Sequence, residues 1–259
     1  MFQAHLMNLG YCADWGYLIE KKSHNDLFKG EINFIKKFKK LNIINCIDVG
    51  ANIGLYSKEI LSNLDTKVIA FEPLPGCTED LEILQKEFTN RFKYYQLAAS
   101  NENMKRVLNF GGDKSGLASL ETSINIVPFY SAENKNKIDV ETIKLDNFIN
   151  DSRFKNLDFI KVDVEGHEIK VLKGANDLIM KNKVKLIQVE FSTIHLMTKD
   201  TVFKISEELK GYIPSQLNLI NGKLRLINPR NYLSNIYLLT NIIFIEKEFF
   251  DKYQRILLN

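Results

Sequence analysis

The sequence predicts an α/β protein built on a largely parallel sheet with helices on both faces. From residue 43 onward, apolar runs typical of buried strands alternate with segments of helical periodicity, which is the pattern of βαβ units. Acidic residues stand directly after several of these runs, at the sheet edge where open α/β folds bind ligands. The length of 259 residues, with 45% hydrophobic and 26% charged residues, suits one large domain of this kind.

The chain divides into an expected N-terminal lid or extension, residues 1–42, and a main domain, residues 43–259. The first part contains the aromatic cluster YCADWGY, residues 11–17, which could shape an acceptor pocket, pack internally or bury against a second copy in a homodimer. Within residues 31–41, apolar side chains recur every three residues, which predicts one face of a helix with lysines on the other. These apolar side chains are Ile32, Ile35, Phe38 and Leu41.

Each later element follows from its local pattern. Short apolar runs bounded by turn residues predict strands at residues 43–49, 67–73, 92–100, 157–164 and 184–191. Helical spacing of apolar residues predicts helices at 54–64, 78–88, 168–181 and 202–210. Two further strands are expected to close the chain, with Asn221 and Gly222 as a turn between them, and the apolar stretch 236–247 fits a buried strand.

Residues 101–145 depart from this alternation. They begin with a stretch rich in glycine and serine and continue with a run that alternates like a half-exposed strand. We expect this segment to pass over the upper edge of the sheet.

The composition argues against several classes of protein. The net charge of +3 is small and its charges are interspersed, so the sequence offers no basic groove for nucleic acid. The cysteines Cys12, Cys46 and Cys77 have neither metal-ligand spacing nor a disulfide framework, which suits a reducing cytoplasm. We expect no leader and no membrane span, because no apolar run approaches the roughly 18 residues that a membrane helix needs.

Acids follow four of the predicted strands. The ligand side of the sheet is therefore expected to present Asp48 with Gly50, Ala51, Asn52 and Gly54; then Glu72 and Pro73; then residues 97–100; then Asp163, Glu165 and His167; and finally Glu190.

The turn after the first strand predicts the bound cofactor. Gly50 and Gly54 allow a tight turn and a close approach to the start of a helix, whose free N–H groups favour a carboxylate. Asp48 can accept hydrogen bonds from an ammonium group, and Glu72 can accept them from two ribose hydroxyls. Ammonium, carboxylate and ribose together describe S-adenosylmethionine.

A dinucleotide is the competing interpretation of this turn. It would require Gly-x-Gly-x-x-Gly around a pyrophosphate, but Asn52 and Ser57 occupy the second and third glycine places. An aspartate beside a pyrophosphate would also repel it. A tight turn without any ligand is the remaining alternative, and Glu72 argues against it.

The second group of candidates is catalytic. A methyl acceptor must lie near the ends of the first and fourth strands, where Asp163, His167 and Glu190 could supply a general base for an alcohol. His167 could instead be a helix-start histidine bonded to the backbone. Asp163 and Glu190 could also hold a Mg²⁺-like ion through their oxygens, although sugar hydroxyls are the favoured partners. His195 could reach the site from the side, but an ordinary loop histidine is the favoured interpretation.

Taken together, these residues resemble the FkbM family of S-adenosylmethionine-dependent methyltransferases. The resemblance is carried, in order, by IDVGANIGLYS, VIAFEPLP, LAAS, IKLDNF, LDFIKVDVEGHEIKVLKGA and QVEF, and is strong over residues 43–195. It implies a class I, Rossmann-like fold with a seven-stranded sheet whose last strand is antiparallel. It also implies cofactor contacts at Asp48, Gly50, Asn52, Gly54, Glu72 and the backbone near Ala98.

The resemblance further implies methylation of a hydroxyl oxygen on a sugar or a secondary metabolite. The lysine-, asparagine- and isoleucine-rich composition favours a bacterium, and hence a sugar or nucleotide-linked sugar of a surface polysaccharide such as a capsule. A nucleic-acid or protein methyltransferase would need a basic groove or a recognition domain. A non-catalytic cofactor-binding protein would have no use for Asp163, His167 and Glu190 together.

Overall fold

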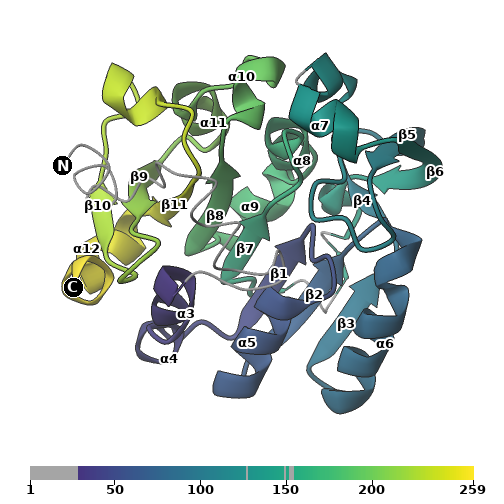
Figure 1. Ribbon diagram of the computed structural model, residues 1–259. Coiled ribbons are helices and arrows are strands. Elements are labelled where there is room, and N and C mark those ends of the chain that lie inside the picture. The colour runs from purple at the N-terminus through teal and green to yellow at the C-terminus, as the bar shows by residue number, and fades with distance from the viewer. Residues whose placement is uncertain (1–28, 127, 149, 152–154) are drawn as a thin grey trace.

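The structure, a computed structural model, describes residues 29–126, 128–148, 150–151 and 155–259. Most of the expected N-terminal lid, including the aromatic cluster 11–17, His5, His24 and Cys12, lies outside the described residues. Figure 1 shows a twisted sheet at the centre of the described chain, with helices on either side of it.

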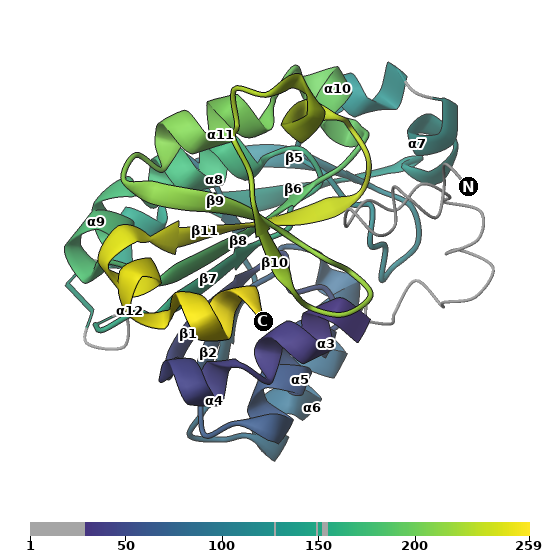
Figure 2. The ribbon, with the colours of Figure 1, turned by 90° about the vertical axis from the view of Figure 1, so that its left-hand side faces the viewer.

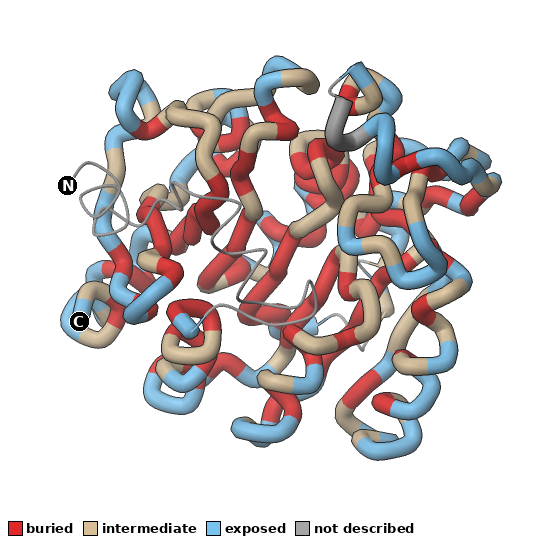
Figure 3. Tube along the Cα trace, in the orientation of Figure 1, coloured by how far each residue is buried: buried red, intermediate tan, exposed pale blue. Residues whose placement is uncertain are grey.

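Five neighbouring parallel strands form the core of this sheet. In spatial order they are β3 (Phe92–Tyr95), β2 (Lys67–Phe71), β1 (Asn45–Val49), β7 (Phe159–Val162) and β8 (Leu186–Phe191). Their residues alternate between two buried faces, and Figure 3 shows the strands as mostly buried tube. The strand order reverses direction at β1, and ligands bind at such a point in doubly wound folds.

The sheet continues past β8 with three more strands. β11 (Thr240–Glu246) pairs antiparallel with β8 and with β9 (Tyr212–Leu217), and β10 (Leu224–Leu226) pairs antiparallel with β9 at the edge. The expected antiparallel last strand is confirmed in β11. The described sheet has eight strands instead of the expected seven, because the turn around Asn221 and Gly222 adds β10 as a hairpin.

Helices cover both faces of the sheet (Figure 2). One face carries α3 (Lys29–Ile35), α4 (Phe38–Leu41), α5 (Leu55–Asn63), α6 (Thr78–Glu87) and α12 (Lys247–Leu258). The other carries α8 (Glu168–Gly174), α9 (Asn176–Asn182) and α11 (Val202–Glu208). Each face has its own apolar core, so the predicted α/β class is confirmed.

Two predicted helices are interrupted. The helix expected at 31–41 is divided into α3 and α4, and its buried apolar side chains are Phe34, Ile35, Phe38 and Leu41. The three-residue spacing placed Ile32 on the buried face of this helix, but Ile32 is only half-buried and Phe34 is buried instead. The helix expected at 168–181 breaks at Ala175, whose φ of −117° is not helical.

The segment 101–145, together with residues 98–99, forms a second, three-stranded sheet above the first. Its strands are β4 (Ala98–Ala99), β6 (Asn136–Ile143) and β5 (Lys105–Phe110), in that spatial order. The strand expected at 92–100 is therefore split between the two sheets. Shorter elements complete the described chain: η1 (Pro75–Cys77), η2 (Thr122–Ile126), α7 (Pro128–Glu133), η3 (Leu145–Phe148), α10 (Ile194–Thr198) and η5 (Tyr232–Asn235).

In the part of the chain that the structure describes, no helix has both the length and the apolar character to cross a membrane.

Candidate active site

A cleft of about 510 Å³ opens at the carboxyl ends of the central strands. Its floor consists of residues that end or follow β1, β2, β7 and β8, and the segment 101–145 forms its roof. We call the part beyond β1 and β2 the β2 end; it includes Asn52, Ile53, Glu72, Pro73 and Ala98. We call the part beyond β7, β8 and β11 the β8 end; it includes Glu31, Asp163, Glu165, Glu190 and Asn241.

The turn after β1 requires glycine. Gly50 has a φ of +77°, and a Cβ placed on it would lie 1.8 Å from the backbone oxygen of Asp163. Gly54, with a φ of +82°, begins α5 and packs against α6 without lining the cleft. Asn52 also has a positive φ, 48°, and its side-chain amide donates to the Ser115 carbonyl in the roof at 3.1 Å. The turn is thus fixed against β7 below and against the roof above.

Glu72 stands at the β2 end with its side chain toward the turn. It is buried, and its two oxygens accept backbone hydrogen bonds from Asn52 and Leu74, each at 2.8 Å. Burial raises the pKa of Glu72 from 4.5 to about 7 in spite of these hydrogen bonds. Each oxygen has a further lone pair, so the carboxylate can also accept from the hydroxyls of a ligand. Pro73 and Ala98, which the sequence analysis also named as cofactor contacts, line the same end of the cleft.

Asp48 is not placed as the sequence interpretation expected. Its side chain is 1% exposed, and it does not line the described cleft. The hydroxyl of Ser57 donates to its Oδ2 at 2.7 Å, and the backbone N–H of Ser57 donates to it as well. Asp48 therefore caps the first turn of α5 from beneath, because β1 directs it to the face that α5 covers. An ammonium group in the cleft does not meet its side chain directly.

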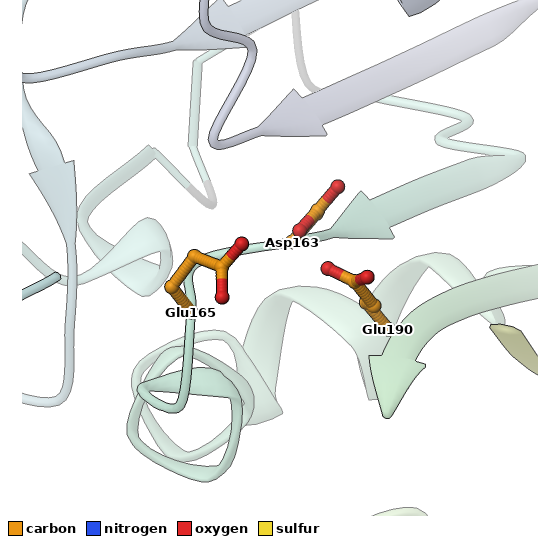
Figure 4. Close-up of side chains that lie close together, drawn as sticks. All are labelled: Asp163, Glu165 and Glu190. Atoms are coloured by element: carbon orange, nitrogen blue, oxygen red, sulfur yellow. The ribbon is translucent and has the colours of Figure 1, made fainter. Parts of the chain in front are cut away.

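Three carboxyl groups gather at the β8 end (Figure 4). Asp163 and Glu165 follow β7, Glu190 lies in β8, and each offers an oxygen within 4.8 Å of the others. Burial raises the pKa of Asp163, but the Lys161 ammonium and a hydrogen bond from Glu190 outweigh burial and hold this pKa below its usual 3.8. Burial and the charge of Asp163 raise the pKa values of Glu165 and Glu190 well above 4.5. The ionised form is therefore favoured at Asp163 and the protonated form at Glu165 and Glu190.

A row of buried polar side chains, which the sequence interpretation missed, lies beneath these acids. Strand pairing sets Asp48 beside Lys161, and Lys161 beside Gln188. The Lys161 Nζ donates to Asp163 Oδ2 at 2.7 Å, and the Lys161 side chain is 6% exposed. Burial lowers the pKa of Lys161, but the charges of Asp163 and Asp48 raise it by more, so the amine stays protonated. The available signal was the two-residue period, since Lys161 and Gln188 share the phase of Asp163 and Glu190 within apolar strands.

Gln188 joins this row to the helices above it. It accepts a hydrogen bond from the Tyr56 hydroxyl at 2.7 Å. Its amide donates to Glu31 Oε1 at 3.1 Å and to Asn241 Oδ1 at 3.0 Å, and the amide of Asn241 donates to Glu31 Oε1 at 3.3 Å. All four residues are buried, and Glu31, Tyr56 and Asn241 line the cleft. Glu31 and Asn241 were not among the predicted site residues.

His167, a predicted base, has protein partners on both ring nitrogens. Its Nε2 lies 2.9 Å from the Ser100 hydroxyl, and its Nδ1 lies 2.6 Å from Glu121 Oε1. Burial raises the pKa of Glu121, but hydrogen bonds from His167 and Lys170 lower it by more, to about 2. The ring is 1% exposed at the edge of the cleft, so His167 joins β4, the roof and the start of α8.

His195 supports the turn that carries the acids. Its Nδ1 accepts from the Ser192 N–H at 3.1 Å, so its Nε2 carries the proton and donates to Glu168 Oε2 at 2.9 Å. Glu168 Oε1 accepts from the N–H groups of Val164 and Gly166, at 3.1 and 3.2 Å. His195 and Glu168 are both 1% exposed, and His195 lies in α10 (Ile194–Thr198), where the sequence interpretation favoured an ordinary loop histidine.

The proposed Mg²⁺ ligands Asp163 and Glu190 gain a third oxygen donor in Glu165. Oxygen donors suit a hard divalent cation. The Lys161 ammonium, however, is already bonded to Asp163 Oδ2, and a metal ion would have to compete with it for this oxygen.

The profile of the "Methyltransferase FkbM domain" matches residues 48–213. The match includes the turn after β1, Glu72 and the three clustered acids, and it leaves Glu31 and Asn241 outside. The methyltransferase sdnD of Sordaria araneosa is 25% identical over 208 residues, which cover 68% of this chain and 80% of that protein. The hexuronic acid methyltransferase AglP of Haloferax volcanii is 26% identical over 150 residues, which cover 55% of this chain and 54% of that protein.

Solved structures of methyltransferases resemble the chain at low identity. Precorrin-6y C5,15-methyltransferase of Geobacter metallireducens shares 12% identity with a TM-score of 0.42, covering 83% of this chain and 88% of that one. The tRNA (uracil-54, C5)-methyltransferase of Pyrococcus abyssi, in complex with S-adenosyl-L-homocysteine, shares 11% identity with a TM-score of 0.39, covering 83% of this chain and 37% of that one.

Proposed function

The chain belongs to the FkbM family of methyltransferases, and from that membership we propose that it transfers the methyl group of S-adenosylmethionine to a hydroxyl oxygen of a sugar. The observation that carries this proposal is the carboxyl cluster of Asp163, Glu165 and Glu190, which faces the β8 end of a cleft whose β2 end suits a nucleoside. The similarity to a protein named hexuronic acid methyltransferase supports a sugar as the acceptor class.

The β2 end fits the nucleoside part of the cofactor. Glu72 offers two carboxylate oxygens to a ribose diol, and Pro73 and Ala98 offer apolar surface beside it. Within α5 the first backbone hydrogen bond runs from Lys58 to Gly54, so the N–H groups of Leu55 and Tyr56 precede the helical ladder and can donate to a carboxylate. When bound, S-adenosylmethionine supplies an electrophilic methyl group on a positively charged sulfur.

Asp163 is the proposed base. It is ionised at neutral pH, it lines the β8 end, and Lys161 and Glu190 fix its orientation. A carboxylate with a low pKa is a weak base, but a hydroxyl proton becomes acidic as its oxygen gains a methyl group, so a weak base is sufficient. The acceptor hydroxyl donates its hydrogen bond to Asp163 and releases its proton there. Both nitrogens of His167 are held by Ser100 and Glu121, so we assign His167 to positioning of the site.

Titration calorimetry with S-adenosylhomocysteine tests the cofactor part of this proposal. We expect the wild-type protein and Asp163→Asn to bind with similar affinity. Glu72→Ala should bind at least about tenfold more weakly, because each lost hydrogen bond to a charged group is worth about 1.5–3 kcal/mol. If wild type does not bind, or if Glu72→Ala binds as well as wild type, the assignment of the β2 end is wrong.

The catalytic part is tested by methyl transfer to a panel of sugars. Asp163→Asn is isosteric and should reduce kcat by about 10²- to 10⁴-fold, the range for loss of a general base. Unchanged turnover in Asp163→Asn, together with intact cofactor binding, would refute Asp163 as the base.

A further inference from the structure

Carboxyl groups line the β8 end of the cleft, and the lysine described at this end, Lys161, already forms an ion pair with one of them. Glu31, Asp163, Glu165 and Glu190 line this end. Lys161, beneath them, bonds Asp163 at 2.7 Å. The other lysine that lines the described cleft, Lys114, belongs to the roof near Asn52 and bonds Asp80 at 2.7 Å.

We propose that the acceptor enters the β8 end as an uncharged, hydroxyl-bearing glycosyl unit, and that Glu31 and Asn241 select it against units that carry a carboxylate or a phosphate. This proposal rests on the proposed function and narrows its substrate class. It separates this chain from the hexuronic acid specificity that the name of one relative records.

Anionic units are disfavoured because they lose their hydration on entering the β8 end and gain no unpaired cation among the residues described there in return. An anionic group that leaves water for the β8 end meets a lining of carboxyl groups and finds both described lysines of the cleft engaged. Like charges brought together at an interface oppose binding strongly. Hydroxyl groups meet no such penalty, since a hydroxyl can both donate to and accept hydrogen bonds at the carboxyl groups that line this end.

Hydrogen bonds hold the side chain of Glu31 in the position that the proposed selection of the acceptor requires. The amides of Gln188 and Asn241 both donate to its Oε1, at 3.1 and 3.3 Å, so the orientation of its carboxyl group is fixed from β8 and β11. Glu31 is 5% exposed and lines the cleft. Glu31 and Asn241 lie outside the matched family segment, residues 48–213.

Matched acceptors test the proposal. Methyl glycosides of glucose, galactose and mannose are each compared with the corresponding uronic acid and 6-phosphate, with labelled S-adenosylmethionine as the methyl donor. We expect at least one neutral glycoside to be methylated, with kcat/KM about tenfold or more above its uronic acid and phosphate counterparts. Preference for a charged member overturns the proposal but leaves the methyltransferase function standing.

S-adenosylhomocysteine calorimetry on the same preparation separates the two proposals. Binding without methylation of any neutral glycoside overturns the inference about the acceptor. Absence of binding refutes the proposed function itself.

Glu31→Gln identifies the selecting residue. This variant keeps an oxygen that can accept from Gln188 and Asn241 but loses the charge, so the preference for the neutral sugar over its uronic acid should fall about threefold or more. Glu248→Gln, which removes an exposed carboxylate paired with Lys183 outside the cleft, is the matched control and should leave the preference unchanged. An unchanged preference in Glu31→Gln, in a folded protein that binds S-adenosylhomocysteine, would overturn the role given to Glu31.

Discussion

Lys161 determines which carboxyl group of the β8 end is ionised. Its ammonium lies against Asp163, which is half-buried, and within the field of Asp48, which is buried. Removal of a buried cation leaves its partner charges uncompensated, which costs more free energy than the intact pair contributes. Lys161 thus acts on the acceptor through Asp163 and is a positioning residue.

Lys161→Met should raise the pKa of Asp163, because the ammonium that holds this pKa down is gone. The acid limb of the kcat profile should therefore move to higher pH. The free energy of unfolding should fall by about 3–5 kcal/mol, the usual cost of breaking a buried ion pair. The pH profile of methyl transfer and a denaturant titration measure the two effects.

Lys173→Met is the control for this change. Lys173 is half exposed and pairs with Glu208 at 3.6 Å, so its loss should alter stability by less than about 1 kcal/mol and leave the pH profile in place. An unshifted profile in Lys161→Met would show that Lys161 does not set the ionisation of Asp163.

At the scale of an element, the turn between β7 and α8 depends on Glu168. One carboxyl oxygen of Glu168 holds two backbone N–H groups of the turn, and the other holds His195 from α10. The acids Asp163 and Glu165 belong to this turn, so their positions depend on a buried glutamate that does not line the described cleft.

Glu168→Ala should lower the free energy of unfolding by at least about 3 kcal/mol, since it leaves three buried donors without an acceptor and each costs about 1–3 kcal/mol. Glu168→Gln keeps one acceptor oxygen and should lose less. Thermal and denaturant unfolding of both variants, with exposed Glu248→Ala as the comparison, provide the measurement. Equal stability of Glu168→Ala and Glu248→Ala would contradict this account of the turn.

Helices, strands and the residues at strand ends could be predicted where a single local sequence pattern, such as an apolar run, dominated. Asp163, Glu165 and Glu190 follow apolar runs, so their meeting at one sheet edge followed from parallel pairing alone. The partners of His167 could not be found in this way, because Glu121 lies in a segment without periodicity and reaches His167 only through the roof. The orientation of Asp48 could not be predicted either, since the motif indicates the strand end but not the face to which the side chain points.

At the scale of the whole molecule, buried acids shape the pH dependence of stability. The pKa of Glu72 is raised from 4.5 to about 7, and the pKa values of Glu165 and Glu190 are raised as well, so the folded chain holds protons that the unfolded chain has released. These groups lower stability as the pH rises through and above 4.5. Glu121, with its pKa lowered to about 2, acts in the opposite sense and loses its contribution as the pH falls from 4.5 toward 2.

The apo protein should therefore unfold at a lower temperature at pH 8 than at pH 5.5. S-adenosylhomocysteine should reduce this difference, because ribose hydroxyls that donate to Glu72 favour its ionised form. Thermal unfolding across this pH range, with and without the ligand, measures both effects. A melting temperature that rises from pH 5.5 to pH 8 in the apo protein would contradict the burial assigned to these acids.

The space above Gly50 admits only a hydrogen atom, because the backbone oxygen of Asp163 would lie 1.8 Å from any added methyl group. Two segments that are distant along the chain therefore share one wall of the cleft, and neither can shift without the other. A recombinant chimera of two family members, with its junction between positions 50 and 163, would take the two segments of this wall from different parent proteins. Crossovers before residue 48 or after residue 213 preserve this wall and exchange only the edge formed by Glu31 and Asn241. If Glu31 and Asn241 select the acceptor as proposed, acceptor preference is inherited separately from the methyl-transfer machinery.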